Sequence, residues 1–416
     1  MHRSNTGPSP AKGALVLAAC FLAALGEGID LQAPGVTLPV LAPLFQLSGN
    51  EGGGVLAGFF SLKSLFLSMS TFGLFFGALI GGRLSDLFGR KGVLVASVFL
   101  FGLFSALTAH STDARMLLWM RFFTGLGLGG CYANMIAITA ENISPRWRNT
   151  AVGILYAGLP MGGALVSLTS RAWGTPEHWG HIYYLGALVP LAGMLGILLF
   201  VPNLKPLAHA IRKPSASHAL WGEGRAPQTA VLWGLFVLAL LIQYLLLSWL
   251  PTLLISKGLP RGDAQLTQVA LNLCSVPGSI IAGMLIDRPS WRALGIVGVF
   301  GAGIVSLVIL AVAPAQMPLT LAVVGFVGFA VAGTQAITYA MAPGVYPTPV
   351  RGTGVGFALA VGRLGAALGP LLAGAMLGAG LQPNQVLMVM APLMVLAGLC
   401  ALWLGRAGHR AAPALP

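Results

Sequence analysis

Long apolar runs follow one another through almost the whole sequence, and they limit its fold more than any other feature. An α-helix rises about 1.5 Å per residue, so a run of about 20 apolar residues crosses the hydrocarbon core of a bilayer. Alternating segments of about ten residues, which indicate a membrane β-barrel, do not occur. The sequence therefore predicts an all-α integral membrane protein. Its twelve predicted transmembrane helices are 14–38, 55–82, 93–110, 116–140, 151–170, 182–201, 230–255, 266–286, 293–313, 319–342, 353–376 and 386–405.

The composition supports a membrane protein and argues against several other classes. Of the 416 residues only 8% are charged, whereas a soluble domain has about a quarter. The net charge of +13 is spread over many short loops, which is typical of topology signals and not of a nucleic-acid-binding patch. The four cysteines lie singly in apolar runs, so neither a disulfide framework nor a metal site is indicated. We expect no cofactor, no metal and no nucleic-acid partner.

Basic residues in the loops predict the orientation of the chain. If the N-terminus lies inside the cell, most lysine and arginine residues outside the spans fall in cytoplasmic loops or in the termini. Those on the other side are Arg115, Arg171, Lys257 and Arg261. By the positive-inside rule, both termini are expected in the cytoplasm. The first apolar run is too long for a signal-peptide core, so we expect it to be retained as the first span.

Two carboxylic acids interrupt the first apolar run. Glu27 and Asp30 are three residues apart and therefore project from one face of the predicted helix. A charge at the centre of a membrane helix is costly, so acids in such positions usually face a polar cavity and carry function. Gly26 and Gly28 have no side chains, so the helix is narrower at the same place. The alternative is a soluble core helix with two satisfied acids, which the rest of the sequence disfavours.

The two halves of the chain repeat each other. The motif Gly82–Asp86 recurs as Gly283–Asp287, and Arg148–Gly153 recurs as Arg351–Gly356, at almost the same spacing. Parallel repeats of six spans build one large class of secondary transporter, with the substrate site near the midplane between the halves. We therefore expect two pseudo-symmetric six-helix bundles. The predicted domains are 1–201 and 230–416, with a cytoplasmic linker over 202–229.

Two conspicuous motifs, Gly82–Lys91 and Arg121–Gly129, combine glycines with charged residues. The first resembles the loop signature of the major facilitator superfamily, although Leu87 stands where a basic residue is usual, and the second resembles its fourth-span motif. Glu141 with Arg148 resembles the loop that closes the cytoplasmic gate. The resemblance implies the major facilitator fold with alternating access. The residues to which it gives a gating role are Asp86, Arg90, Glu141, Arg148, Asp287 and Arg351.

Further stretches extend this resemblance over nearly the whole chain. They are Glu27–Gln32, Tyr244, Trp249–Pro251, Val361–Ala366 and Gly369–Pro370. They are similar to the aromatic acid:proton symporter family, and within it to the hydroxyphenylpropionate transporters. This implies import of an aromatic carboxylate, such as 3-(3-hydroxyphenyl)propionate or a hydroxybenzoate, with a proton across a bacterial inner membrane. Glu27 and Asp30 match the paired first-span acids of the family, and Arg363 matches its eleventh-span arginine.

Arg363 and Asp30 are both expected near half-depth in the membrane. By helical rise, Arg363 lies about 18 Å and Asp30 about 24 Å from the cytoplasmic surface. A buried arginine can bind a carboxylate bidentately, and a buried carboxylic acid takes up a proton more readily than an exposed one. Alternatively, Arg363 forms a permanent salt bridge with Asp30. Arg121 is either a structural ion-pair partner or a proton-relay and substrate-binding element.

Polar and aromatic residues on the predicted seventh and tenth spans complete the candidate substrate site. The resemblance implies that these spans line the cavity, and their rings and amides can stack on a phenol and hydrogen-bond it. The candidates are Gln243, Tyr244, Trp249, Gln335, Thr338 and Tyr339. Taken alone, each of them is more often a packing or interfacial residue.

Two other functions stay open. Gly158–Gly163 in the fifth span partly resembles the antiporter signature, which favours a proton-coupled exporter of small aromatic or drug-like compounds. A membrane enzyme is disfavoured, because the motifs of hydrolases, metalloproteases and nucleotide-binding enzymes are missing. We therefore predict a monomeric transporter, not an enzyme, whose partners are an aromatic acid, protons and the lipid bilayer. No function is predicted for the long stretch Ser48–Lys63, the extension of the first loop.

Overall fold

The computed structural model describes residues 10–47, 54–144, 147–202, 220–288, 290–347 and 350–410. All regular secondary structure in these residues is helical, and 12 of the helices are long and apolar enough to cross a membrane. This confirms the predicted all-α membrane fold. The helices are α1 (Pro10–Leu44), α2 (Val55–Phe59), α3 (Leu62–Phe88), α4 (Arg90–Thr108), α5 (Ala114–Asn142), α6 (Arg148–Trp173), α7 (Gly180–Phe200), the 3₁₀-helix η1 (Gly222–Gly224), α9 (Ala226–Ser256), α10 (Arg261–Asp287), α11 (Arg292–Val312), α12 (Met317–Val345), α13 (Arg351–Gly378) and α14 (Pro383–Arg410).

The span predicted over 55–82 differs from the structure, which has two helices there. A break at Phe60–Ser61 separates α2 from α3. The Ser61 hydroxyl accepts a hydrogen bond from the backbone N–H of Ser64 at 3.3 Å, as a residue that caps a helix N-terminus does. The Ser64 hydroxyl in turn donates to the carbonyl oxygen of Gly58 at 2.9 Å. Hydropathy alone cannot detect a break made by one capping hydroxyl inside an apolar run.

The chain divides into two compact units. Unit 1 comprises Met1–Leu47 and Met69–Ala208, and unit 2 comprises Ser48–Ser68 and His209–Pro416. The boundary between the units therefore falls inside α3, and α2 belongs to unit 2. Residues 203–219, which make up most of the predicted linker, lie outside the described residues.

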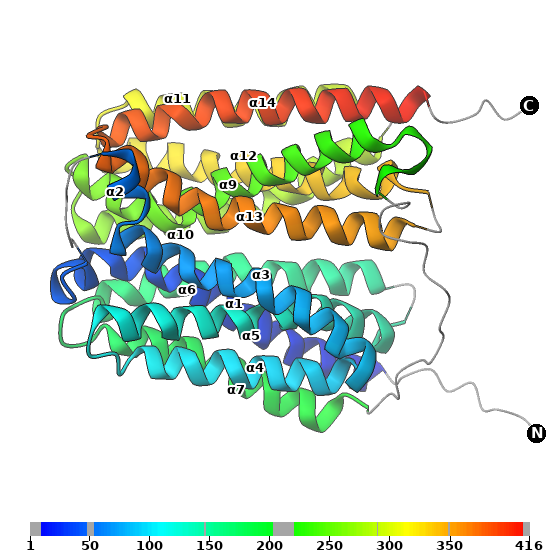
Figure 1. Cartoon of the computed structure of the whole chain (residues 1–416), viewed down its shortest axis with the longest axis horizontal. Helices are drawn as coiled ribbons and strands as arrows, with labels where there is room; N and C mark the ends of the chain where they lie inside the picture. Colours follow the sequence, from blue (N-terminus) through cyan, green and yellow to red (C-terminus); the bar gives the residue numbers. More distant parts are fainter. Residues whose placement is uncertain are drawn as a thin grey trace, which may run out of the picture. The chain divides into compact units, whose positions relative to one another are not determined.

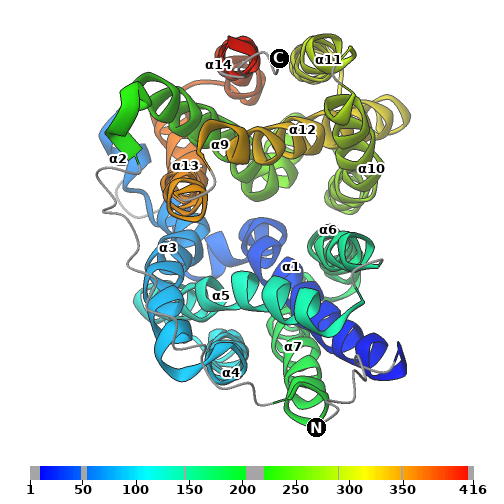
Figure 2. The ribbon, with the colours of Figure 1, turned by 90° about the vertical axis from the view of Figure 1, so that its right-hand side faces the viewer.

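In unit 1, α1 packs along both α6 and α7, and α4 packs against α5 and α7 (Figure 2). Two glycines allow the close approach of α1. A Cβ at Gly28 would overlap the carbonyl oxygen of Leu159 in α6, and one at Gly26 would press on the ring of Pro190 in α7. Contacts of this kind are typical of small residues at helix interfaces in membranes. The glycines therefore determine where α1 lies, and α1 carries the two predicted acids.

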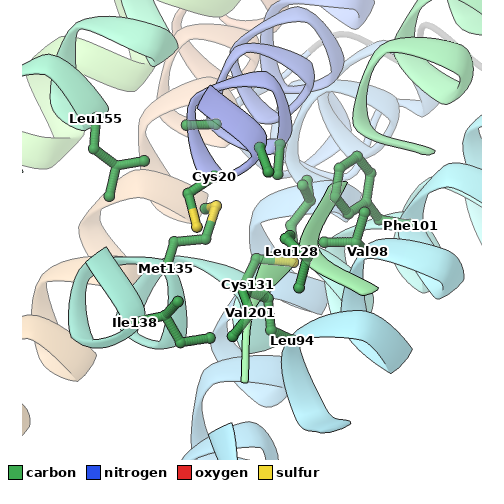
Figure 3. Packing of buried hydrophobic residues seen from close by; sticks show 14 of the residues in the cluster. Cys20, Leu94, Val98, Phe101, Leu128, Cys131, Met135, Ile138, Leu155 and Val201 are labelled. Atoms are coloured by element: carbon green, nitrogen blue, oxygen red, sulfur yellow. The ribbon is translucent and has the colours of Figure 1, made fainter. Parts of the chain in front are cut away.

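The apolar core of unit 1 lies beside these contacts and is built by α1, α3, α4, α5, α6 and α7 (Figure 3). Cys20 and Cys131 are buried within it as free thiols, next to Met135. Cys274 and Cys400 of unit 2 are also free and partly buried. The cysteines are therefore small core residues, as the sequence predicts.

In unit 2, α9 packs along α13, α10 along α12, and α11 along α14. Three glycines, Gly362, Gly365 and Gly369, lie where α13 meets α9. A Cβ at Gly365 would overlap the carbonyl oxygen of Val237 in α9. The absence of side chains at these three positions brings α13 close to α9, and the predicted substrate arginine lies on α13 between the first two of these glycines.

A lysine at the end of α9 caps α11. The ammonium of Lys257 donates to the carbonyl oxygens of Leu310, Ala311 and Ala313 at 2.7, 3.2 and 3.1 Å. The last carbonyls of a helix have no partner within the helix, so this contact satisfies them and joins α9 to α11. Partial burial of the ammonium lowers the pKa of Lys257.

The short helix α2 docks on the end of α13 (Figure 1). A Cβ at Gly58 would overlap the carbonyl oxygen of Gly374. The backbone N–H of Gly54 donates to the carbonyl oxygen of Gly378 at 3.0 Å. The described part of the first-loop extension therefore packs against α13, the helix that carries the predicted substrate arginine.

We expect Gly58→Val to destabilise the protein, because the new side chain cannot fit against the backbone of α13. Overpacking of this kind typically costs about 1–3 kcal/mol. The measurement is thermal unfolding of the purified protein in detergent, together with limited proteolysis of the first loop. Gly298→Val is the matched control, since a Cβ at Gly298 meets nothing within 4 Å. Equal melting temperatures for the two variants would contradict the docking of α2.

Candidate functional site

A fully buried ion pair joins α1 to α5 in unit 1. Nη2 of Arg121 lies 3.0 Å from Oδ1 and 2.9 Å from Oδ2 of Asp30, and both side chains are 0% exposed. A buried charge is costly unless it is paired, so each group makes the burial of the other tolerable. The structure thus supports the ion-pair role for Arg121. Since Asp30 has a counter-ion within unit 1, a permanent salt bridge to Arg363 is not required for its burial.

Three further residues hold this pair, and no sequence pattern identifies them. The Ser105 hydroxyl donates to Oδ1 of Asp30 at 2.6 Å. The guanidinium of Arg121 lies over the ring of Tyr183, 5.1 Å from its centroid, in a cation–π contact. The hydroxyl of Tyr183 is hydrogen-bonded to that of Thr37 at 2.9 Å. One serine, one threonine and one tyrosine in apolar helices carry no sequence signal, because only tertiary packing brings them together.

Arg121 has donors that the pair does not use. Its Nε and Nη1 atoms are buried and have no hydrogen-bond partner among the described residues. An arginine can donate five hydrogen bonds, and buried donors are usually paired. The guanidinium therefore has capacity for a further acceptor, in addition to Asp30.

Glu27 lies one turn before Asp30 on α1 and is 1% exposed. Among the described residues of unit 1, Glu27, Asp30 and Arg121 are the buried charged side chains. The buried part of unit 1 thus places two carboxylic acids and one guanidinium on neighbouring helices. A buried acid that exchanges a proton changes the charge of such a region, so this group of side chains is chemically able to bind and release a proton.

The ion pair lies near the end of unit 1 at which α4 ends and α7 begins. Ser105 is three residues before the end of α4, and Tyr183 is three residues after the start of α7. Both are therefore about 5 Å inside these helix ends. Asp30 is near the middle of the 35-residue α1, which runs obliquely past its neighbours (Figure 2). The depth expected for Asp30 from the helical rise of α1 stays a prediction.

In unit 2, the predicted substrate arginine meets a predicted aromatic residue. Nη1 of Arg363 donates to the hydroxyl of Tyr244 at 3.0 Å. Tyr244 is buried and Arg363 is partly exposed. The three glycines of α13 explain the contact, because they bring α13 close enough to α9 for the two side chains to meet. A phenol and a guanidinium side by side can bind an anionic aromatic molecule.

The other predicted substrate residues have different surroundings. The indole N–H of Trp249 donates to the carbonyl oxygen of Pro370 at 3.0 Å, so this buried ring is used to join α9 to α13. The ring of Tyr339 packs edge-on against Phe236, with 5.3 Å between centroids. Nε2 of Gln335 is buried and has no hydrogen-bond partner among the described residues.

Two predicted gating residues of unit 1 form an ion pair. Arg90 at the start of α4 pairs with Glu141 near the end of α5, and both side chains are substantially exposed. Nearby, the Ser85 hydroxyl donates to Oδ1 of Asn134 at 2.6 Å. Exposed ion pairs contribute little stability, so this contact is more significant as a link between helix ends than as a source of free energy.

The remaining gating candidates are less defined. Asp287 and Arg351 are exposed, and Nε of Arg351 donates to the carbonyl oxygen of Tyr346 at 3.3 Å. The side chains of Asp86 and Arg148 lie outside the described residues. A gating role for these four residues stays a prediction.

The family model that describes the Major Facilitator Superfamily matches residues 16–327. The chain is 37% identical over 402 residues to the 3-(3-hydroxyphenyl)propionate transporter of Escherichia coli strain K12, covering 96% of both chains. It is 31% identical to the gallate transporter of Pseudomonas putida and 29% identical to the 4-hydroxybenzoate transporter of Pseudomonas aeruginosa. In both cases the match covers 96% of this chain and 94% of the relative.

Solved structures share the fold at lower sequence identity. A bacterial homologue of the human lysosomal transporter Spinster gives a TM-score of 0.73 at 17% identity, covering 98% of this chain and 100% of that one. A D-xylose–proton symporter gives a TM-score of 0.70 at 16% identity, covering 97% and 98%. Together with the family model, these matches confirm the predicted major facilitator fold.

We expect Asp30→Asn to destabilise the protein strongly, because it leaves the fully buried Arg121 without a counter-ion. Breaking a buried pair by removing one partner typically costs about 3–5 kcal/mol. The double variant Asp30→Asn with Arg121→Gln removes both charges and should recover part of the loss. Thermal unfolding in detergent measures both effects. A single variant as stable as the unmodified protein would show that the pair does not exist in the membrane protein.

Proposed function

Because the chain belongs to the major facilitator superfamily of transporters, we propose that it imports an aromatic carboxylate together with a proton. The names of the relatives support an aromatic acid, such as 3-(3-hydroxyphenyl)propionate or a hydroxybenzoate, as the substrate. The observation that carries the proposal is the contact between Arg363 and Tyr244. It joins a carboxylate-binding group to a phenol ring on helices that the glycines of α13 hold together.

Arg363 binds the substrate carboxylate in this proposal. Its planar guanidinium matches the two oxygens of a carboxylate, and Tyr244 holds one edge of it in a fixed orientation. The ring of Tyr244 offers an apolar face to the aromatic ring of the substrate. Tyr339 and Gln335 on α12 complete the wall, while Trp249 supports it by joining α9 to α13.

Glu27 and Asp30 bind the proton in this proposal, with Glu27 as the residue that changes its charge. Asp30 accepts hydrogen bonds from Arg121 and Ser105, so its carboxyl oxygens are already engaged within unit 1. Glu27 is the second buried acid beside the single buried arginine of the described part of unit 1. Proton binding makes the Glu27 side chain neutral, which lowers the cost of moving the loaded helices.

The orientation and the gates belong to the same proposal. The transporter lies in a bacterial inner membrane with both termini in the cytoplasm, as the distribution of basic residues indicates, and it acts as a monomer. The contact between Arg90 and Glu141 links helix ends that change position as the cytoplasmic side opens. Asp86, Arg148, Asp287 and Arg351 act at the same stage.

Uptake of labelled benzoates, cinnamates and phenylpropionates into proteoliposomes tests the substrate and the direction of transport. We expect accumulation when the outside is more acidic than the inside, and a fall in uptake as the outside pH rises, because fewer protons are available to the acid pair. Reversal of the imposed pH gradient distinguishes import from export. Accumulation only with the reversed gradient would identify an exporter and overturn the proposal.

Arg363→Lys should raise the KM for the aromatic acid about tenfold, since an ammonium cannot reproduce the planar two-point contact and a tenfold change corresponds to about 1.4 kcal/mol. Initial uptake rates over a range of substrate concentrations give the KM. Arg171→Lys, at the exposed end of α6, is the matched control and should leave it unchanged. An unaltered KM in the Arg363 variant would remove this residue from the substrate site.

Glu27→Gln should abolish accumulation driven by a proton gradient but leave exchange of labelled for unlabelled substrate, because the neutral amide mimics a permanently protonated acid. The two assays are run on the same proteoliposomes, so that the exchange assay controls for folding. Gradient-driven accumulation at the unmodified level would exclude Glu27 as the proton-binding residue.

A further inference from the structure

We propose that Gln243 on α9 and Gln335 on α12 bind a ring hydroxyl of the substrate, so that the transporter selects hydroxylated aromatic acids over unsubstituted ones. This rests on the proposed function, because it assumes that Arg363 holds the carboxylate of the same molecule. Neither glutamine is needed to explain the fold, and each of them presents a polar atom that the described residues leave unpaired.

The first observation is the state of the two amides. Oε1 of Gln243 and Nε2 of Gln335 are both buried, and neither has a hydrogen-bond partner among the described residues. Buried polar atoms in folded proteins are nearly always paired, because an unpaired one loses its contacts with water and gains nothing. Two such atoms on neighbouring helices therefore point to a ligand that supplies the missing contacts.

The second observation is that the two amides face the same region of unit 2. The edge-on contact between Phe236 and Tyr339 shows which faces of α9 and α12 meet. Gln243 and Tyr244 follow Phe236 by seven and eight residues, so all three lie on one face of α9. Gln335 precedes Tyr339 by four residues and shares its face of α12.

The heights of the two amides also agree. Two spans separate α9 from α12, so these helices run in opposite directions. Starting from the Phe236–Tyr339 contact, Gln243 lies about 10 Å along α9, and Gln335 lies about 6 Å in the same direction along α12. The difference is less than one helical turn. Both amides therefore lie on the same side of the Phe236–Tyr339 contact as Tyr244, the residue that is hydrogen-bonded to Arg363.

A phenolic hydroxyl suits this pair of amides. It donates one hydrogen bond and accepts others, so it can donate to Oε1 of Gln243 and accept from Nε2 of Gln335. Since every amide carries a donor and an acceptor, the two glutamines can bind the hydroxyl in either orientation of their amide groups. A ring without the hydroxyl would leave both amides buried and unpaired, which is how binding sites reject analogues that lack a polar group.

The test compares uptake of 3-(3-hydroxyphenyl)propionate and 3-phenylpropionate by the full-length transporter in proteoliposomes. For the unmodified protein we expect a KM at least about tenfold lower for the hydroxylated acid. Gln243→Leu and Gln335→Leu should each raise that KM about three- to tenfold, as expected for one lost hydrogen bond. The KM for the unsubstituted acid should stay the same or fall, because no amide then has to be buried unpaired.

Gln268→Leu is the matched control. Gln268 is a buried glutamine of the same unit, and its Nε2 donates a long hydrogen bond of 3.5 Å to the carbonyl oxygen of Leu247. The Gln268→Leu substitution should change the KM for both acids by the same factor and so leave the ratio of the two KM values unaltered. If a leucine variant does not fold, Gln335→Asn keeps the amide and withdraws it by one methylene, and it should reduce the ratio in the same way.

The two possible failures are distinguishable. Uptake of both acids with a KM ratio unchanged by the Gln243 and Gln335 variants would overturn the inference and leave the proposed function standing. Uptake of neither acid by the unmodified protein, under any pH gradient, would overturn the proposed function and the inference together.

Discussion

The organisation of unit 1 depends on one interaction, the buried ion pair between Asp30 and Arg121. Replacing such a pair by apolar residues of similar volume is often neutral or even stabilising, so stability alone does not explain why a buried pair is present. In a membrane protein the pair is even less favourable than apolar residues, because apolar side chains at the same positions would carry no desolvation cost. The pair is therefore better explained by function. It holds a charge, supported by Ser105 and Tyr183, at a defined position beside Glu27.

Close packing of helix backbones makes the polar contacts of both units specific. Gly28 lets α1 meet the backbone of α6, and Gly365 lets α13 meet the backbone of α9. In each helix the charged residue stands next to glycines in the sequence, as in Gly26–Asp30 and Gly362–Gly365. A larger side chain at these glycines would push the helices apart and separate the charged residue from its partner. The glycines and the charged residue therefore act together, because the glycines allow the close helix contact that places the charged residue against its partner.

The sequence identifies the charged residues of both units because charges are rare in apolar helices, so each one is conspicuous. Glu27, Asp30, Arg121 and Arg363 are recognisable for that reason alone. Their partners are not, since Asp30 could have paired with either arginine, and Ser105, Tyr183 and Thr37 are ordinary residues until the fold brings them together. The break between α2 and α3 was hidden for a related reason: it depends on one serine hydroxyl that hydropathy does not register. Sequence patterns thus indicate which residues matter, and tertiary contacts determine what each one does.

The proposed coupling of substrate and proton is consistent with the positions of the buried polar groups in the two units. In unit 1, Arg121 is the counter-ion of Asp30, and Glu27 is a second buried acid one turn away on α1. In unit 2, Nη1 of Arg363 donates to the hydroxyl of Tyr244, which orients the planar guanidinium for a contact with a carboxylate. In the proposed cycle, a proton binds to an acid of the first unit and the substrate carboxylate binds to the arginine of the second. Neutral groups cost less than charged ones in a low-dielectric interior, so under that proposal each bound partner lowers the cost of reorienting the helices.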